Sequence, residues 1–440
     1  MTRWIGRWLA VALVLLPGFL ALGALEAWPA RTGAWLDLAG RLTGAVGLAC
    51  LLVAAAVSVR IPGWDRPFGG LTRLWKLHHR LGLASFLLLL AHPVLMALGR
   101  VPLSPAAAAG VLLPGVVAGS PGSAWALWAG WIALLALMAF LAPSFQLFGK
   151  PEYQRWKTLH FLSGATVVAG VLHALPLTRT LPREAALALW GGLGSLAVAV
   201  FLWRALVARR VLRRPWRIVE NRPLADRVTR LFLEPEDGRP LAHRPGQFVY
   251  LTPRDPGLGA GRGEEHPYTV SSAPGAERLE ITVKALGDAS SALLDVAEGS
   301  RAQVEGPYGD FPSPTLREHR QLWIGGGVGI TPFVSAVRAR AAAPMGDTVL
   351  LNCANDPSRA YFLDVLMEAS ADLEDLIVVP HYYVREGPLA RDFLLAHCPD
   401  AAERHWFVCG PPVLVELARR LARELRVPRG RFHSEDFVFL

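Results

Sequence analysis

The chain has 440 residues, of which 52% are hydrophobic and 18% charged, and its formal net charge is +9. Its mean hydropathy is +0.32, which is higher than an ordinary soluble protein shows. Much of the basic excess flanks apolar runs instead of forming a patch with aromatic residues, which excludes nucleic-acid binding. The four cysteines form no CxxC pair, which excludes an encoded zinc or iron–sulfur site.

Six apolar segments in the first half are long enough to cross a bilayer core of about 30 Å, which requires roughly 20 helical residues. The alternative for the first segment is a cleaved signal peptide, but its length and the lack of a small-x-small cleavage site favour a retained helix. The predicted spans are residues 4–25, 38–59, 77–98, 124–147, 159–175 and 186–207.

Basic residues collect in the segments 60–76 and 148–158 and again after the sixth span, whereas the loop 99–123 contains only Arg100. Positively charged loops stay in the cytoplasm. The sequence therefore predicts a multi-pass protein of a bacterial inner membrane with both termini cytoplasmic, and six spans agree with that parity.

The third and fifth spans each carry a histidine near both ends. His78 and His92 are 14 residues apart, close to four turns, so they share one face at a separation of about 21 Å. His160 and His173 are 13 apart, so the fifth helix must tilt, kink or unwind locally, or the haems must be approached from different angles. Neutral imidazole is a common axial ligand of haem iron, and polar rings inside a membrane are costly. We predict that these four histidines hold two b-type haems; the alternative is inter-helix hydrogen bonding.

Beyond residue 215 the pattern changes to a water-soluble one. Alternating strands near 247–251, 268–271 and 279–283 predict an antiparallel β-barrel, and from residue 321 strands alternate with helices as in a parallel α/β sheet. The predicted α/β strands are 322–324, 348–352, 377–382 and 406–408. The expected fold is thus multi-domain: a six-helix all-α bundle (1–214), a flavin-binding β-barrel (215–315) and an α/β nucleotide-binding domain (316–440).

The barrel contains a possible flavin motif, in which an aromatic ring and hydroxyls alternate along a strand. A ring in this position can stack on an isoalloxazine, and hydroxyls can bind a ribityl or phosphate chain. A basic residue and a Gly-x-x-Ser turn follow downstream. Alone, the strand would be an ordinary one, and the order and spacing of the pieces are what favour a flavin site. The predicted FAD-binding residues are His266, Pro267, Tyr268, Thr269, Ser271, Ser272, Lys284, Gly287 and Ser290.

A glycine-rich loop between a strand and a helix predicts the nucleotide site, because glycines let backbone N–H groups approach a pyrophosphate at a helix N-terminus. Cys409 ends the last predicted core strand, where its thiol would reach the nicotinamide. Ser358 and Arg359 can bind the 2′-phosphate of NADPH, the nucleotide we favour over NADH; the alternative is an exposed helix cap. The remaining predicted nucleotide-binding residues are Gly325, Gly326, Gly327, Gly329, Thr331, Pro332, Gly410 and Pro411.

These motifs, in this order, resemble the ferredoxin–NADP reductase-like FAD/NAD(P)H module, and the paired-histidine half resembles the ferric reductase and NADPH oxidase family. The resemblance runs from about residue 40 to Leu440. His266 stands where most such reductases have Arg, and Ala289 replaces the usual aromatic of the diphosphate turn. The tail 433–440, with Phe439, resembles the aromatic tail that covers the flavin in this family; the alternative is a closing edge strand.

The resemblance implies electron transfer from NAD(P)H through FAD and two haems to an external acceptor, oxygen or ferric iron. The expected partners are the bilayer and that small acceptor, with no obligate protein partner. A second hypothesis is a haem reductase that passes electrons to a quinone or a partner protein. A third, a transporter with a regulatory nucleotide domain, predicts charged or broken helices around a central site.

Overall fold

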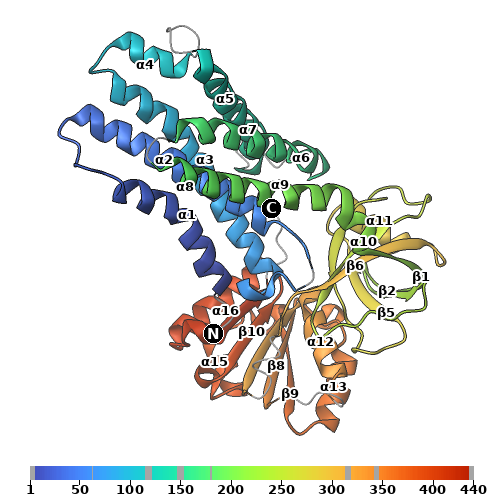
Figure 1. Cartoon of the computed structure of the whole chain (residues 1–440). Helices are drawn as coiled ribbons and strands as arrows, with labels where there is room; N and C mark the ends of the chain where they lie inside the picture. The colour runs from blue at the N-terminus through green and yellow to red at the C-terminus, as the bar shows by residue number, and fades with distance from the viewer. Residues whose placement is uncertain are drawn as a thin grey trace. The chain divides into compact units, whose positions relative to one another are not determined.

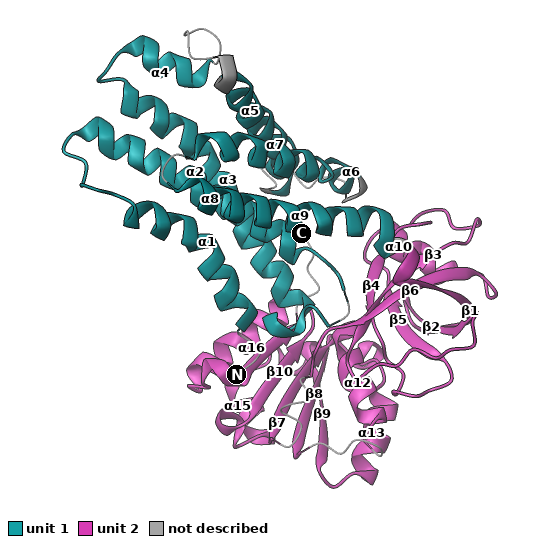
Figure 2. Ribbon diagram, viewed as in Figure 1, with its two compact units in different colours: residues 1–209, 440 teal, residues 210–439 magenta. Residues whose placement is uncertain are grey.

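The computed structural model describes residues 5–61, 63–113, 121–145, 153–178, 181–312, 319–340 and 346–435. It divides into two compact units, one ending at Arg209 and one beginning at Arg210 (Figure 2). The first unit is helical, and the second contains two β-sheets.

The helical unit is built from apolar helices that the long Leu, Ala and Val runs predict (Figure 1). Among the described residues, six helical stretches are long and apolar enough to cross a membrane: Ile5–Gly23, Thr32–Val57, Leu71–Arg100, Ala124–Ser144, Arg155–Leu177 and Arg183–Val207. The six predicted spans are therefore confirmed, although the second and third begin earlier than predicted. The helices are α1 (Ile5–Gly23), α2 (Thr32–Val57), α3 (Leu71–Arg100), α4 (Pro105–Leu112), α5 (Pro121–Leu141), α6 (Tyr153–Leu159), α7 (Leu162–Leu177), α8 (Arg183–Ala186), α9 (Gly192–Leu202) and α10 (Ala208–Val211).

The short helix α4 lies in a loop and was not predicted. Ser104 caps it by accepting a hydrogen bond from the Ala107 amide at 3.1 Å, and Pro105 occupies the first turn, where its missing N–H costs nothing.

The fifth span is interrupted. Helix α6 ends at Leu159 and α7 begins at Leu162, so that His160 and Phe161 form a turn between them. This interruption is the local unwinding that the 13-residue spacing of His160 and His173 predicts. It changes the direction in which His160 leaves the helix axis.

Large apolar side chains lie both inside the helical unit and on its surface. Leu52, Leu137 and Trp190 are buried between the helices. On the outside, Trp8 and Ile132 are 71% and 56% exposed. In a soluble protein such a surface would be a liability, whereas lipid accommodates it.

The first sheet of the second unit is antiparallel, in the order β4-β3-β6-β1-β2-β5. An isolated bridge between Val270 and Ile281 joins its two ends, so the sheet curls into a half-barrel where the sequence predicts an antiparallel β-barrel. Trp216, Leu231 and Ile281 point into its apolar core. The strands are β1 (Arg213–Ala225), β2 (Val228–Pro235), β3 (Phe248–Pro253), β4 (His266–Thr269), β5 (Leu279–Lys284) and β6 (Arg301–Tyr308); helix α11 (Asp288–Ala292) follows β5.

The second sheet is parallel, in the order β11-β10-β7-β8-β9, and buries both faces, as parallel sheets do. One face packs on α12 and α13, and the other on α15 and α16. The elements are β7 (Gln321–Gly326), α12 (Thr331–Arg338), β8 (Thr348–Ala354), α13 (Leu363–Asp372), β9 (Leu376–Tyr382), α14 (Tyr383–Glu386), α15 (Arg391–His397), β10 (His405–Cys409), α16 (Pro412–Glu424) and β11 (Phe432–Glu435).

Two sequence expectations need comment here. Strand β10 was expected to be the last core strand, but β11 pairs beside it in parallel and forms the sheet edge. The described part of the C-terminal tail is therefore an edge strand, and Phe439 lies outside the described residues. The predicted domain limits at 214 and 315 stay a prediction; the first falls just inside β1.

Candidate functional site

Four histidines in the helical unit form two pairs. The ring centroids of His78 and His160 are 6.2 Å apart, and those of His92 and His173 are 6.1 Å apart. Two metal–nitrogen bonds of about 2 Å each, together with the radii of the two rings, also come to about 6 Å. The neighbouring His79 is exposed, which leaves His78 as the member of this dipeptide that faces a partner.

Three of the four rings are oriented by backbone carbonyls. The Nδ1 atoms of His78 and His92 lie 2.8 Å and 2.7 Å from the carbonyl oxygens of Ala54 and Gly40 on α2. His173 Nδ1 lies 2.8 Å from the carbonyl oxygen of Ala126 on α5. A carbonyl can only accept, so Nδ1 carries the proton in each ring and the Nε2 lone pair is free to bind a metal.

His160 is held differently. Among the described residues, its buried Nδ1 has no hydrogen-bond partner. Its ring packs instead between the rings of Phe140 and Trp156, each with its centroid 5.0 Å away. Because His160 lies in the turn between α6 and α7, packing rather than a hydrogen bond sets its orientation.

Two glycines make room for the second pair of rings. A Cβ on Gly44 would lie 2.6 Å from Nδ1 of His92, and a Cβ on Gly130 would lie 2.5 Å from Nδ1 of His173. Each glycine is one helical turn after the carbonyl that accepts the hydrogen bond. Sequence reasoning missed both glycines; isolated glycines in apolar helices facing a histidine are the signal that could have found them. The paired rings, the oriented nitrogens and these cradles fit a metal cofactor held between each pair.

The predicted flavin motif is strand β4 with the residues that follow it. His266 Nε2 lies 3.3 Å from a carboxylate oxygen of Glu264. Tyr268 packs against the barrel core, and burial raises the pKa of its hydroxyl. The motif therefore lies on β4, directly before the bridge between Val270 and Ile281 that joins the two ends of the sheet.

The two serines after the strand are buried and already engaged. Ser271 Oγ donates to the carbonyl oxygen of Glu280 at 3.2 Å, and the Glu280 amide donates to Ser272 Oγ at 3.1 Å. These hydroxyls close the barrel by joining β4 to β5. Their predicted role as flavin ligands stays a prediction.

The predicted diphosphate turn is the start of α11, which Gly287 caps and which contains Ser290; Lys284 lies at the end of β5. Ser290 Oγ accepts hydrogen bonds from the amides of Leu286 and Gly287 at 2.9 and 3.0 Å. Ala289 lies close to Gly261, because a Cβ on Gly261 would lie 2.7 Å from its methyl group. Gly261 therefore has no room for a side chain beside Ala289.

The glycine-rich loop lies between β7 and α12, and its glycines serve different purposes. An added Cβ would lie 2.5 Å from Ile330 at Gly325, 2.4 Å from Leu414 at Gly326, and 2.5 Å from the Cys409 carbonyl oxygen at Gly329. Gly329 is required by packing because its neighbour is backbone, whereas at Gly325 and Gly326 the neighbour is the end of an apolar side chain. Gly327 has φ +56° and no atom within 4 Å of its added Cβ, so it is the glycine whose backbone faces open space.

Thr331 and Pro332 follow the loop and begin α12. Thr331 Oγ donates to the Val328 carbonyl oxygen at 2.8 Å, and Pro332 occupies the first turn. Across the sheet, Cys409 ends β10 and is 1% exposed, and Gly410 and Pro411 follow it into α16. The structure thus places the 325–332 loop and the 409–411 turn at the same carboxyl edge of the parallel sheet, where nucleotides bind in such folds.

Ser358 and Arg359 lie in a short helical turn after β8. Its cap is Asp356, which accepts a hydrogen bond from the Ser358 amide at 3.0 Å, so the alternative prediction of Ser358 as the cap is wrong. The Ser358 hydroxyl also bonds to this carboxylate, and that hydrogen bond lowers the pKa of Asp356. Arg359 is 53% exposed, with its Nε 3.8 Å from the same carboxylate.

Comparison with known families agrees with this architecture. Residues 43–171 match a ferric reductase like transmembrane component, residues 232–312 an FAD-binding domain, and residues 323–420 an oxidoreductase NAD-binding domain. The chain therefore has the domain architecture of ferric reductase-like proteins. It is a multi-pass membrane oxidoreductase in which a transmembrane component is joined to a flavin- and nucleotide-binding reductase module, an arrangement for electron transfer driven by NAD(P)H.

Individual relatives match the reductase module. Ferredoxin–NADP reductase B of Sorangium cellulosum is 32% identical over 241 residues, which cover 50% of this chain and 96% of the relative, so that part of the chain belongs to the ferredoxin–NADP reductase family. The ferredoxin reductase component of a 3-ketosteroid-9-alpha-monooxygenase of Mycobacterium tuberculosis is 33% identical over 207 residues. This match covers 46% of the chain and 57% of the relative, so the chain spans little more than half of that protein.

A solved structure has a similar extent. The FAD/NAD-binding domain of a nitric oxide dioxygenase from Vibrio cholerae is 25% identical and superimposes with a TM-score of 0.44. It covers 50% of this chain, and 97% of that domain is matched.

Proposed function

We propose that the chain moves electrons from cytoplasmic NAD(P)H, through FAD and two b-type haems, to oxygen or ferric iron on the far side of the membrane. The observation that carries this proposal is the pairing of His78 with His160 and of His92 with His173 at ring separations of 6.2 and 6.1 Å. FAD takes up two electrons as hydride and releases them singly, and haem carries one at a time.

The paired histidines would act as axial ligands through Nε2. Carbonyl acceptors at Ala54, Gly40 and Ala126 keep three rings in the tautomer that leaves this atom unprotonated. Hydrogen bonds of this kind also raise the basicity of the ligand, so the backbone of α2 and α5 would influence the potentials at which electrons are held.

The direction of transfer follows from charge. His78 comes soon after the basic segment 60–76, and His160 soon after the basic segment 148–158. By the positive-inside rule this pair lies on the cytoplasmic side. His92 is 14 residues further along α3, about 21 Å deeper, so the His92–His173 pair lies toward the outer face.

At the nucleotide end, the carboxyl edge of the parallel sheet would bind NAD(P)H. The exposed backbone at Gly327 would bind the pyrophosphate. The 409–411 turn would lie beside the nicotinamide, with Cys409 closest to it. We retain NADPH as the favoured nucleotide because Arg359 is exposed beside the adenosine end of this edge. Asp356 opposes that preference, since a second negative charge there disfavours a 2′-phosphate.

The test uses the full chain in sealed inner-membrane vesicles of a bacterial host, with NADPH or NADH on the cytoplasmic face and an impermeant ferric chelate on the other. We expect the parent to reduce the chelate. His92→Leu should abolish this reduction while its flavin is still bleached by the nucleotide. His79→Leu, an exposed histidine on the same helix, is the matched control and should behave as the parent. Reduction of the chelate by His92→Leu at the parent rate would show that the two-pair relay is wrong.

A further inference from the structure

Helix α12 connects the nucleotide loop to the end of the flavin motif. Its first turn directly follows the glycine-rich loop. Near its other end, Ser335 Oγ donates to the carbonyl oxygen of Ser272 at 2.8 Å, and an Arg338 guanidinium nitrogen donates to that of Ser271 at 2.9 Å. Both carbonyls lie within three residues of Thr269, where strand β4 ends.

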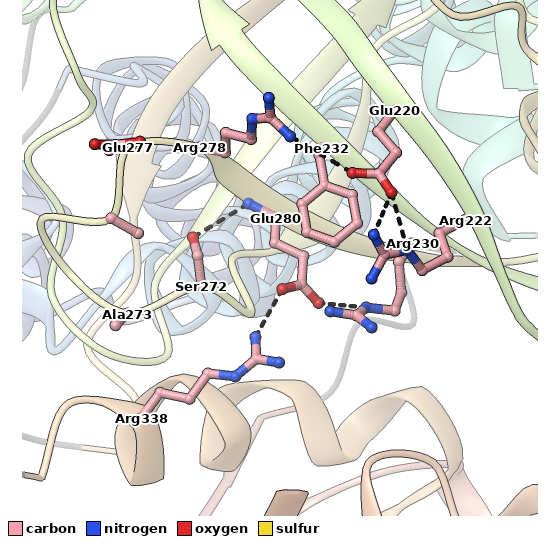
Figure 3. Close-up of a pocket in the computed structure, with 11 residues that line it drawn as sticks. Glu220, Arg222, Arg230, Phe232, Ser272, Ala273, Glu277, Arg278, Glu280 and Arg338 are labelled. Atoms are coloured by element: carbon pink, nitrogen blue, oxygen red, sulfur yellow. Dashed lines mark hydrogen bonds and ion pairs between the residues drawn. The ribbon is translucent and has the colours of Figure 1, made fainter.

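The Arg338 guanidinium is fixed by a nearly buried carboxylate. It lies 2.7 Å from one oxygen of Glu280, and Nε of Arg230 lies 2.8 Å from the other (Figure 3). Glu280 is on β5 and its side chain is 5% exposed. Burial by itself would raise the pKa of Glu280, but the two arginines keep it below the ordinary value. The carboxylate is therefore charged at neutral pH, and it links β5, through Arg230, to β2 and, through Arg338, to α12.

An aromatic ring further restricts both arginines. The guanidinium carbons of Arg230 and Arg338 lie 5.4 and 5.5 Å from the ring centroid of Phe362, within the range of a cation–π interaction. Phe362 has φ 59°, a conformation that few non-glycine residues adopt, and it starts α13. Contacts from three directions thus hold Arg338 in one position.

Helix α12 itself is rigid enough to transmit position. All its residues from Thr331 to Val337 are buried, and Phe333 and Val334 are 0% exposed in the core beneath the sheet. Close-packed interiors move as units instead of deforming locally. A shift at Arg338 or at the glycine loop would therefore be felt at the other end.

We propose that Arg338 is a positioning residue for hydride transfer, which holds the flavin strand in fixed register with the nucleotide loop through α12. This inference rests on the proposed reduction of FAD by NAD(P)H. Arg338, Glu280 and Arg230 belong to none of the sequence motifs. Arg338 contacts the flavin motif at the Ser271 carbonyl, and the backbone of Glu280 bonds to the hydroxyls of Ser271 and Ser272.

The expected effect is kinetic. A misplacement of about 1 Å between reacting atoms can lower a rate by roughly 10²-fold without changing the binding of either reactant. Replacing Arg338 by Gln should therefore slow flavin reduction at saturating nucleotide by about 10- to 100-fold. The Kd for the nucleotide should change little, because the glycine loop is intact.

The experiment is anaerobic stopped-flow reduction of the flavin in the purified full-length protein. Arg338→Gln is compared with Arg338→Lys, which keeps a cation beside Glu280 and should recover part of the rate. Arg222→Gln is the matched control, since Arg222 lines the same pocket as Arg230, Glu280 and Arg338 (Figure 3) and pairs with Glu220 but touches neither Glu280 nor Ser271. It should reduce its flavin at the parent rate.

Each outcome decides the matter. If Arg338→Gln binds FAD and reduces it as fast as the parent, the positioning role is excluded. If that variant does not fold, Glu280→Gln keeps the shape and removes the charge, and it must show the same slowing with an unchanged nucleotide Kd. A parent whose flavin neither NADPH nor NADH can reduce would instead overturn the proposed function, and the positioning role with it.

Discussion

The four membrane histidines differ in what holds the second nitrogen of each ring. His78, His92 and His173 each have a carbonyl acceptor, whereas His160 is held by aromatic packing. The difference follows from local structure, because His160 lies in a turn, whereas the other three histidines lie on helices. Each imidazole ring is thus oriented by the carbonyl group or the aromatic rings that face it. Gly44 and Gly130 allow the rings of His92 and His173 to approach the neighbouring helix closely.

Gly130→Ala tests that approach. The new methyl group would lie 2.5 Å from Nδ1 of His173, so the ring must move away from the Ala126 carbonyl. We expect the variant to lose about one haem of the proposed two, as measured by pyridine haemochrome per protein. Gly192→Ala, with nothing within 4 Å of its added Cβ, should keep the parent content. Full haem content in Gly130→Ala would contradict our assignment of His173.

At the scale of secondary-structure elements, the glycine loop is a single motif in sequence but has two functions in the structure. Gly325, Gly326 and Gly329 allow β7, α12 and α16 to pack closely, and only Gly327 faces open space. A change such as Gly326→Val would therefore damage packing against Leu414 as well as any nucleotide contact. It cannot separate the two effects.

Gly327→Ala separates them better. The left-handed φ of +56° would cost the alanine about 1–2 kcal/mol, but its Cβ would meet no neighbour. If the backbone here receives the pyrophosphate, the KM for the nucleotide should rise about tenfold or more while thermal unfolding shifts by only a few degrees. Steady-state kinetics and a melting curve measure the two effects. An unchanged KM would move the pyrophosphate away from this loop.

At the scale of the whole molecule, our proposal gives the two steps to different parts of the chain. The helical unit would transfer electrons across the membrane, and the second unit would oxidise the nucleotide. The helical unit contains all four paired histidines, and the unit that begins at Arg210 contains both sheets. Hydride transfer needs only nucleotide and flavin, so the first step should not depend on the helices.

A fragment of residues 215–440, expressed alone, should therefore reduce an artificial dye when NAD(P)H and FAD are added. Starting the fragment at 210 is the matched comparison, because β1 begins at Arg213 and the Arg213 side chain pairs with Glu265 and Glu305. We expect the longer fragment to be more stable in thermal unfolding. A folded fragment that binds neither FAD nor nucleotide would contradict the proposed domain division.

Local patterns in the sequence were sufficient for much of the fold. Apolar runs of about 20 residues indicate six spans, strand and helix periodicities indicate an antiparallel half-barrel followed by a parallel sheet, and all of these are present. The basic segments before the third and fifth spans indicated that the two helices run in the same direction, which pairs His78 with His160 and His92 with His173. The 13-residue spacing left a tilt, kink or unwinding of the fifth helix as alternatives, and the helix is interrupted. Such features can be read from sequence because helix rise, strand alternation and bilayer thickness depend on neighbouring residues only.

Contacts between distant residues required the tertiary structure. His92 reaches the Gly40 carbonyl 52 positions away, and Arg338 reaches Glu280 58 positions away. Neither Gly44 nor Arg338 differs in its local sequence from an ordinary helical residue. What sets their roles is the partner that packing brings within a few ångströms, and no periodicity encodes that distance. The sequence by itself therefore determined the secondary-structure elements, the spacing of the histidines and the order of the motifs. The tertiary structure decided which glycines make room for a histidine ring, which serine hydroxyls are already hydrogen-bonded, and which arginine links the helix after the nucleotide loop to the antiparallel sheet.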